Sequence, residues 1–141
     1  MTSRHMQLGI ALAVCSCLSL WACQKEKGDG GGGQTATLHI TLSIAAAPDN
    51  TCQQNESTGN VQVASGQNVT YQGGAVALSQ FEVVFPATST PFASAVISSP
   101  TGAATSAGAF SGTANTPFAY KSLTINNRTC SNPGSLGLIM K

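Results

Sequence analysis

The sequence predicts an all-β protein of the sandwich class. Short apolar segments alternate with the period of strands, and turn residues recur about every ten positions. No window of ten residues shows sustained helical periodicity. A chain of 141 residues suits one folded domain, and we place it at residues 35–141.

The first strand is expected at residues 37–44. Leu38, Ile40, Leu42 and Ile44 alternate with polar residues, which is the pattern of a strand with one buried face. A Pro-Asp-Asn turn signal follows and ends the segment.

Further strands are expected where β-branched and aromatic residues gather between turn signals. In residues 81–85, Phe81, Val83 and Phe85 share the inner face and Glu82 points outward. The other predicted strands are 61–63, 67–71, 92–98, 118–125 and 136–141.

Residues 1–22 have the pattern of a secretory signal peptide. Arg4 precedes the apolar stretch Leu8–Ala22, whose 15 residues are fewer than the roughly 20 that a membrane span needs. The stretch ends in Leu20-Trp21-Ala22-Cys23, which resembles the lipobox of bacterial lipoproteins, with Trp21 larger than the residue usual there. The resemblance implies cleavage after Ala22 and lipidation of Cys23 by a diacylglyceryl group and an amide-linked acyl chain such as palmitate. The alternative is cleavage that leaves Cys23 free.

Residues 23–34 form the expected tether between this anchor and the domain. The run Gly30–Gly33 gives the segment flexibility, because glycine has no side chain to bury. Gln24, rather than Asp, follows the cysteine, and the lipoprotein resemblance then implies the outer membrane. The domain is expected in the periplasm or at the cell surface.

Charged residues make up 8% of the chain, about a third of the usual 25%. Residues 35–141 hold three acids and three bases, which cancel: Asp49, Glu56, Glu82, Lys121, Arg128 and Lys141. This composition excludes a polybasic nucleic-acid-binding protein and leaves few groups for acid–base chemistry.

The five cysteines predict one disulfide. Cys15 and Cys17 belong to the signal peptide and Cys23 to the lipid anchor, so Cys52 and Cys130 remain. In an exported chain a lone remaining pair is most simply a disulfide, here expected to join two polar loops. Two free thiols and a shared metal ion are the alternatives.

No pattern in the sequence selects a catalytic residue, a metal site or a cofactor. His39 and Asp49 could form a triad with a serine, but no Gly-x-Ser-x-Gly segment singles out a nucleophile. We expect His39 to face solvent. The ligand-binding residues cannot be named from the sequence.

The order of segments is similar to that of the cupredoxins, a family of Greek-key β-sandwiches. The similar segments are Gly66–Tyr71, Phe81–Phe85, Phe118–Lys121, Asn132–Gly134 and Leu138–Met140. This resemblance implies a Greek-key sandwich, with an immunoglobulin-like sandwich as the alternative. A blue-copper site needs two histidines and a cysteine, and no histidine follows His39.

Together these features predict a non-catalytic, lipid-anchored protein of the cell envelope. Its partners would be the membrane, through Cys23, and an envelope protein or glycan, but not nucleic acid. The alternative function is copper handling or electron transfer by a cupredoxin relative.

Overall fold

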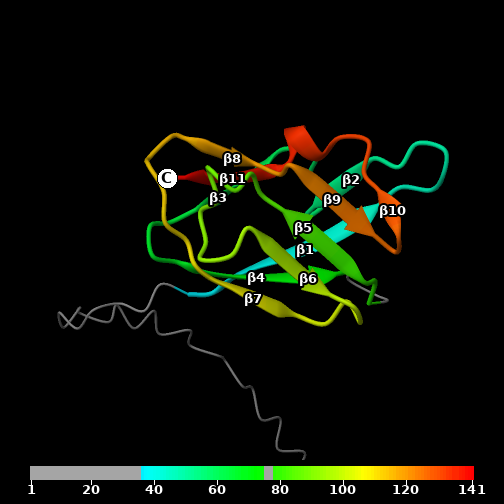
Figure 1. The fold of residues 1–141 in the computed structure, drawn as a ribbon, viewed down its shortest axis with the longest axis horizontal. Coiled ribbons are helices and arrows are strands. Elements are labelled where there is room, and N and C mark those ends of the chain that lie inside the picture. Colours follow the sequence, from blue (N-terminus) through cyan, green and yellow to red (C-terminus); the bar gives the residue numbers. More distant parts are fainter. Residues whose placement is uncertain (1–35, 75–77) are drawn as a thin grey trace, which may run out of the picture. The chain divides into compact units, whose positions relative to one another are not determined.

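The computed structural model describes residues 36–74 and 78–141, which belong to one unit, Gly33–Lys141. These residues form strands and one 3₁₀ turn, which confirms the predicted all-β sandwich (Figure 1). The predicted signal peptide 1–22 and the tether 23–34, with Cys23, lie outside the described residues. Within the described part of the chain, no helix has the length and apolar character needed to cross a membrane.

The elements, in chain order, are β1 (Leu38–Ile44), β2 (Cys52–Gln54), β3 (Asn60–Val63), β4 (Asn68–Gly73), β5 (Phe81–Val84), β6 (Val96–Ser99), β7 (Thr105–Ala109), β8 (Pro117–Ala119), β9 (Ser122–Ile125), β10 (Arg128–Thr129), η1 (Pro133–Ser135) and β11 (Gly137–Met140).

The strands form three sheets, with the orders β2-β1-β4-β7, β10-β9-β5-β6 and β3-β11-β8. Two neighbouring pairs are parallel, β1 with β4 and β3 with β11, and the remaining pairs are antiparallel. Strand β1 contacts β9 across the interior, and β4 contacts β6, so the first two sheets enclose a common core. Apolar residues of β1, β4, β5 and β9 fill that core: Ile40, Leu42, Val69, Val83, Leu123 and Ile125.

The predicted strand 118–125 is two strands in different sheets. Up to Ala119 the chain pairs with β11, and the Tyr120 N–H donates to the Leu136 carbonyl at 2.9 Å. The Lys121 N–H then donates to the Val84 carbonyl at 2.7 Å, and β9 continues along β5. The alternation of side chains shifts by one residue at this point, because the buried residues are Tyr120 before it and Leu123 and Ile125 after it, with Lys121 and Ser122 between. This shift in phase marks the break between the two strands.

The predicted strand 92–98 begins only at Val96. Before it, the Thr90 hydroxyl donates to the carbonyls of Phe92 and Ser94 and accepts from the Phe92 N–H. This local side-chain bonding replaces strand pairing, as Ser and Thr side chains commonly do in turns.

Three short strands, β2, β7 and β10, were not predicted. They are polar or rich in small residues, and β7 reads Thr-Ser-Ala-Gly-Ala with no buried residue. They form strands because β2 pairs with β1, β7 with β4 and β10 with β9. Their strand conformation therefore depends on these neighbours and not on their own side chains.

Six aromatic rings form a continuous row through the core. Each ring meets the next edge to face, with centroids 5.2–6.3 Å apart. In order they belong to Tyr71, Tyr120, Phe85, Phe92, Phe110 and Phe118. Such contacts add about 0.5–1.5 kcal/mol each to the free energy of unfolding beyond the burial of area.

A polar network lies inside this apolar core around Gln54, whose side chain is fully buried. Its Nε2 donates to the carbonyls of Gly59 and Gly137, at 2.7 Å each. Its Oε1 accepts from the Tyr120 hydroxyl at 2.5 Å, and that hydroxyl lies 3.1 Å from the Tyr71 hydroxyl. Every buried side-chain polar atom among the described residues has a partner.

The strand directions give the domain two distinct ends (Figure 1). Ala36 and Lys141 lie at one end, where the Gln67 side chain bonds the Ala36 carbonyl and the Lys141 N–H bonds the Val63 carbonyl. The turns that follow β1, β4, β6 and β9 lie at the opposite end, because β1 and β4 run parallel and β5 returns from there.

We expect Tyr120→Phe to destabilise the fold more than Tyr71→Phe. The first change leaves the Gln54 oxygen without a donor and the Tyr71 hydroxyl without an acceptor, at a cost of about 1–3 kcal/mol for each buried group. The second change leaves the bond from Tyr120 to Gln54 in place. Urea unfolding of both variants measures the difference, and equal losses would contradict the network.

We expect the two tyrosines, the only ones in the chain, to ionise only as the protein unfolds. Burial raises the pKa of both hydroxyls above the ordinary value of about 10. Below about pH 10 the tyrosines are protonated in both states, and the free energy of unfolding is unaffected by them. Above that pH the tyrosines ionise in the unfolded chain only, and the free energy of unfolding falls by about 1.4 kcal/mol per pH unit for each tyrosine. Tyrosinate absorbance should therefore rise together with loss of the β circular dichroism signal; a smooth titration near pH 10 in folded protein would contradict this.

Candidate functional site

The predicted disulfide joins Cys52 and Cys130, which are 78 residues apart in sequence with Cα atoms 5.5 Å apart. The expectation that both lie in loops is correct for Cys130, which follows β10, and wrong for Cys52, which is the first residue of β2; both side chains are buried. Cys52 is the first residue of β2 and pairs with Ile44, and its side chain points into the core. The bond therefore connects a strand end of one sheet to the chain just after β10.

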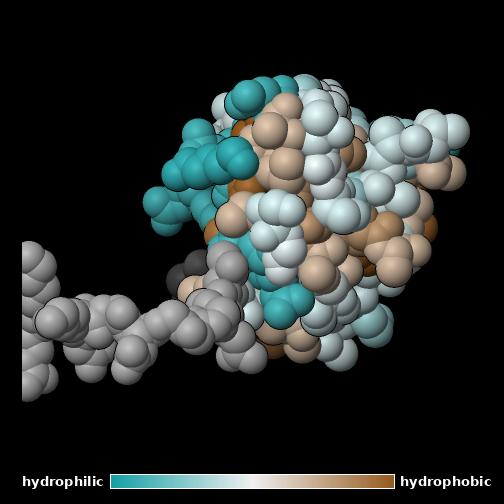
Figure 2. All heavy atoms as spheres, turned by 90° about the vertical axis from the view of Figure 1, so that its left-hand side faces the viewer, coloured by the Kyte–Doolittle hydropathy of each residue, from teal (hydrophilic) through white to brown (hydrophobic). Residues whose placement is uncertain are grey.

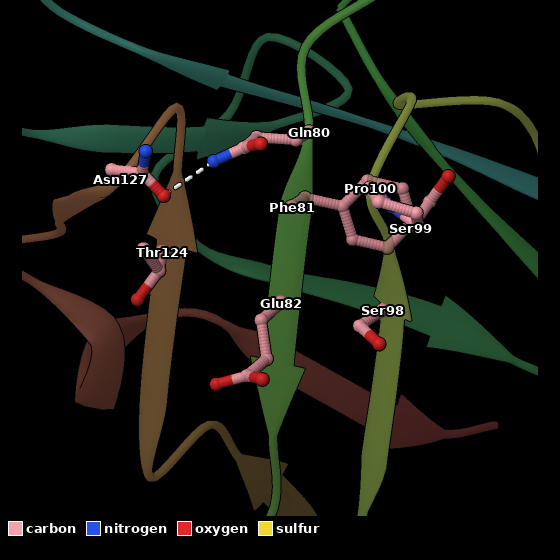
Figure 3. Close-up of a pocket in the computed structure, with 8 residues that line it drawn as sticks. All are labelled: Gln80, Phe81, Glu82, Ser98, Ser99, Pro100, Thr124 and Asn127. Carbon is pink, nitrogen blue, oxygen red and sulfur yellow. Dashed lines mark hydrogen bonds between the residues drawn. The ribbon is translucent and has the colours of Figure 1, made fainter.

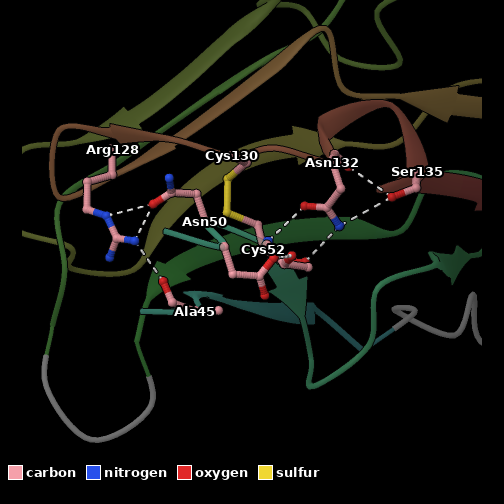
Figure 4. The surroundings of a disulfide bond; sticks show 9 residues. Ala45, Asn50, Cys52, Arg128, Cys130, Asn132 and Ser135 are labelled. Atoms are coloured by element: carbon pink, nitrogen blue, oxygen red, sulfur yellow. Dashed lines mark hydrogen bonds between the residues drawn. A yellow bond between two sulfur atoms is a disulfide. The ribbon is translucent and has the colours of Figure 1, made fainter. Parts of the chain in front are cut away.

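Asn132 holds the backbone beside this disulfide (Figure 4). Its Oδ1 accepts from the Cys52 N–H at 2.7 Å, and its Nδ2 donates to the Cys52 carbonyl at 3.1 Å. One amide side chain thus replaces the neighbouring strand that β2 lacks on that side.

Arg128 fixes the turn between β1 and β2 to the β9–β10 hairpin (Figure 4). Its guanidinium donates to the Asn50 side-chain oxygen and, at 2.9 Å, to the Ala45 carbonyl. The Ser131 N–H also bonds the Asn50 carbonyl at 3.0 Å. The positive charge of Arg128 therefore serves the structure of this end of the domain.

The residues considered for a catalytic triad are not brought together. His39 is exposed near the start of β1, as predicted, and Asp49 lies in the turn beyond the end of that strand. The five residue steps from His39 to Ile44 alone span about 16 Å. The Asp49 carboxylate accepts from the Thr51 hydroxyl at 2.6 Å, a local turn contact.

Cys130 and Met140, whose thiolate and thioether are of the kinds that bind copper in blue-copper sites, also lie apart. The Cys130 sulfur is bonded to Cys52, near the turn end of the sandwich. Met140 pairs with Val63 at the end that holds Lys141. Among residues 36–74 and 78–141, no three His, Cys, Asp or Glu side chains are grouped as a metal site requires.

A groove of about 370 Å³ lies on the outer face of β9, β5 and β6 (Figure 3). Glu82 lies between Ser98 and Thr124 in this groove and is exposed, as the sequence predicted (Figure 3). The residues that line it are Gln80, Phe81, Glu82, Ser98, Ser99, Pro100, Thr124 and Asn127.

Close backbone packing shapes the end of this groove nearest the turns. The backbone of Ser79 lies between two glycines, where a Cβ on Gly73 would be 1.7 Å from the Ser79 carbonyl oxygen and a Cβ on Gly102 2.5 Å from the Ser79 nitrogen. The Gly73 N–H also bonds the Gly102 carbonyl at 3.0 Å. These contacts hold the turn before Gln80 against the turn after Pro100.

A second hollow of about 410 Å³ lies on the other outer face, lined by Thr41, Ser43, Asn55 and Glu56. Asn55 is committed to the fold there, because its side chain accepts from the Thr41 N–H at 2.8 Å and donates to the His39 carbonyl. The side chain of Asn55 in this hollow therefore stabilises β1.

The surface otherwise matches the low charge of the sequence. In Figure 2 pale, weakly polar residues cover much of the visible face, with brown residues in small groups among them. Among the described residues, the large hydrophobic side chains that are exposed belong to Leu78 and Val96.

Comparison with known proteins does not assign the chain to a family. No family model matches it, and neither a curated protein nor a solved structure matches it.

We expect Cys52→Ala/Cys130→Ala to lose about 2–4.5 kcal/mol of the free energy of unfolding, because the bond closes a loop of 78 residues in the unfolded chain. Denaturant unfolding with and without reductant measures the loss in the wild type. The double variant is the control, since reductant should leave its unfolding midpoint unchanged. A wild-type midpoint that reductant does not lower would contradict the role of the bond.

Proposed function

We propose that this protein is an exported lipoprotein of the cell envelope whose β-sandwich is a non-catalytic binding or structural module. The observation that carries the proposal is the segment Leu20-Trp21-Ala22-Cys23 at the end of an apolar stretch of signal-peptide length. The glycine-rich residues that follow would separate the domain from the membrane surface.

The disulfide supports the export part of this proposal. Disulfides persist in oxidising compartments such as the bacterial periplasm and are rare in the cytosol. The bond between Cys52 and Cys130 also uses both cysteines of the domain. Cys23 therefore has no cysteine of the domain to pair with, which agrees with its use as the lipid attachment site.

The arrangement of the domain supports a binding or structural module in place of an enzyme. Among the described residues, the buried hydroxyls of Tyr71 and Tyr120 bond each other, that of Tyr120 also donates to Gln54, and neither residue lines a hollow. His39 is near the start of β1 and Asp49 lies in the turn beyond its end, and the sulfur of Cys130 is bonded to Cys52. Because each of these groups serves the fold or faces solvent, binding is the function that the polar grooves support best.

We expect wild-type protein to incorporate radiolabelled palmitate and sediment with membranes, and Cys23→Ala to lose both properties. More than one acyl chain at about 0.8 kcal/mol per buried CH₂ gives stable anchoring, and the variant has no thiol to accept the diacylglyceryl group. Cys17→Ala is the matched control and should label normally. Label retained in Cys23→Ala would refute the lipoprotein assignment.

A further inference from the structure

The groove over β9, β5 and β6 brings one carboxylate between two hydroxyls. Glu82 is directly opposite Ser98 of β6 and Thr124 of β9 in the sheet register. Directly opposed side chains have Cβ atoms about 5 Å apart, and all three side chains point to the same face (Figure 3). The three residues form one row across the groove.

The polar atoms of this row do not satisfy one another. Among the eight lining residues, the hydrogen bond between side chains joins Gln80 to Asn127 at the edge of the groove (Figure 3). The carboxylate of Glu82 and the hydroxyls of Ser98 and Thr124 thus remain as acceptors for a ligand. A primary ammonium group has three N–H donors and no acceptor, which suits this set.

Charge favours the same kind of ligand. Glu82 is the only charged residue of the eight that line the groove, and none of them is Lys or Arg. Arg128, the base just beyond the adjoining turn, is held by Asn50 and the Ala45 carbonyl. The groove therefore attracts cations and disfavours phosphate, sulfate or carboxylate groups.

The rest of the lining distinguishes a sugar from a lysine side chain. Asn127 and Gln80 carry amides that can bond hydroxyl groups, and Pro100 presents an apolar ring beside Ser99. A lysine side chain would place an apolar four-carbon stem among these polar groups, whereas a sugar ring carries hydroxyls next to an apolar face.

We propose that this groove binds an amino sugar with a free amine, its ammonium on Glu82, Ser98 and Thr124 and its hydroxyls on the Gln80–Asn127 edge. The inference deepens the proposed function, because it names the ligand class of the binding module. It depends on the outer face of one sheet and not on the lipid anchor.

Isothermal titration of the detergent-solubilised mature protein tests the proposal. The probes are a glucosamine hexamer, its fully N-acetylated twin, which lacks the charge, and hexalysine. We expect the glucosamine hexamer to bind at least about tenfold more tightly than either of the others, the effect of one charge-assisted hydrogen-bond set. No heat from the glucosamine hexamer, or equal affinity for either comparison probe, would overturn the proposal.

Variants locate the site. Glu82→Gln should weaken binding of the glucosamine hexamer about tenfold, and Ser98→Ala or Thr124→Val about threefold each. Glu56→Gln, an exposed carboxylate in the hollow on the other face, is the matched control and should leave the affinity unchanged. Equal losses in Glu56→Gln and Glu82→Gln would show unspecific attraction and refute the site.

The two proposals fail separately. Cys23→Ala should keep its affinity for the glucosamine hexamer while losing palmitate, if both are right. A protein that is lipidated but does not bind refutes only the groove, and one that binds but is not lipidated refutes only the anchor. Because Glu82, Ser98 and Thr124 are on the outer face of the sheet, unchanged urea midpoints of their variants confirm that the fold is retained.

Discussion

The hydrogen bond from Tyr120 to the side chain of Gln54 is the contact on which the three sheets depend. A buried amide without partners costs the full desolvation of its donor and acceptor, so this core is stable only if its polar groups meet. Gln54 belongs to the first sheet, Gly137 to the third, and Tyr120 to the point where the chain passes from the third sheet to the second. One side chain therefore fixes how all three sheets register against one another.

The row of aromatic rings follows from the same arrangement. Tyr120 presents its ring to both Tyr71 and Phe85 while its hydroxyl is held by Gln54. The position of that ring then sets the positions of Phe85 and, through it, Phe92 and the rings beyond. A glutamine deep in the protein thus orders apolar packing as well as polar contacts, because a satisfied network allows a single arrangement.

The sequence predicts the strands that carry alternating apolar side chains, which stabilise them by being buried. It misses the strands that form only because a neighbouring strand offers its edge for pairing. Strand β1 was predicted because Ile40 and Leu42 alternate with polar residues, and β5 because Phe81 and Val83 do. Strand β7 has no apolar alternation and exists because β4 offers an edge to it. The cysteine count predicted the disulfide pairing, but not its burial, because the polar neighbours of Cys52 gave no indication that its side chain faces inward.

The groove illustrates a different limit. Glu82 could be assigned to an outer face from alternation, but Ser98 and Thr124 become its neighbours only through the pairing of β5 with β6 and β9. Register between strands far apart in sequence is set by the whole core, so no local pattern in the chain carries it.

The separation of the two ends makes the domain a natural scaffold for display. Both exits of the described chain, at Ala36 and Lys141, are at one end, so a fusion partner joined there would leave the turns of the opposite end uncovered. Those turns are tied down at Asn50 and Ser79, while the exposed stretch from Ala46 to Asp49 between β1 and β2 projects beyond the sheet. Foreign peptides grafted into that stretch would be presented on a domain whose sheets are already held together by the disulfide and by the hydrogen bonds of the buried Gln54.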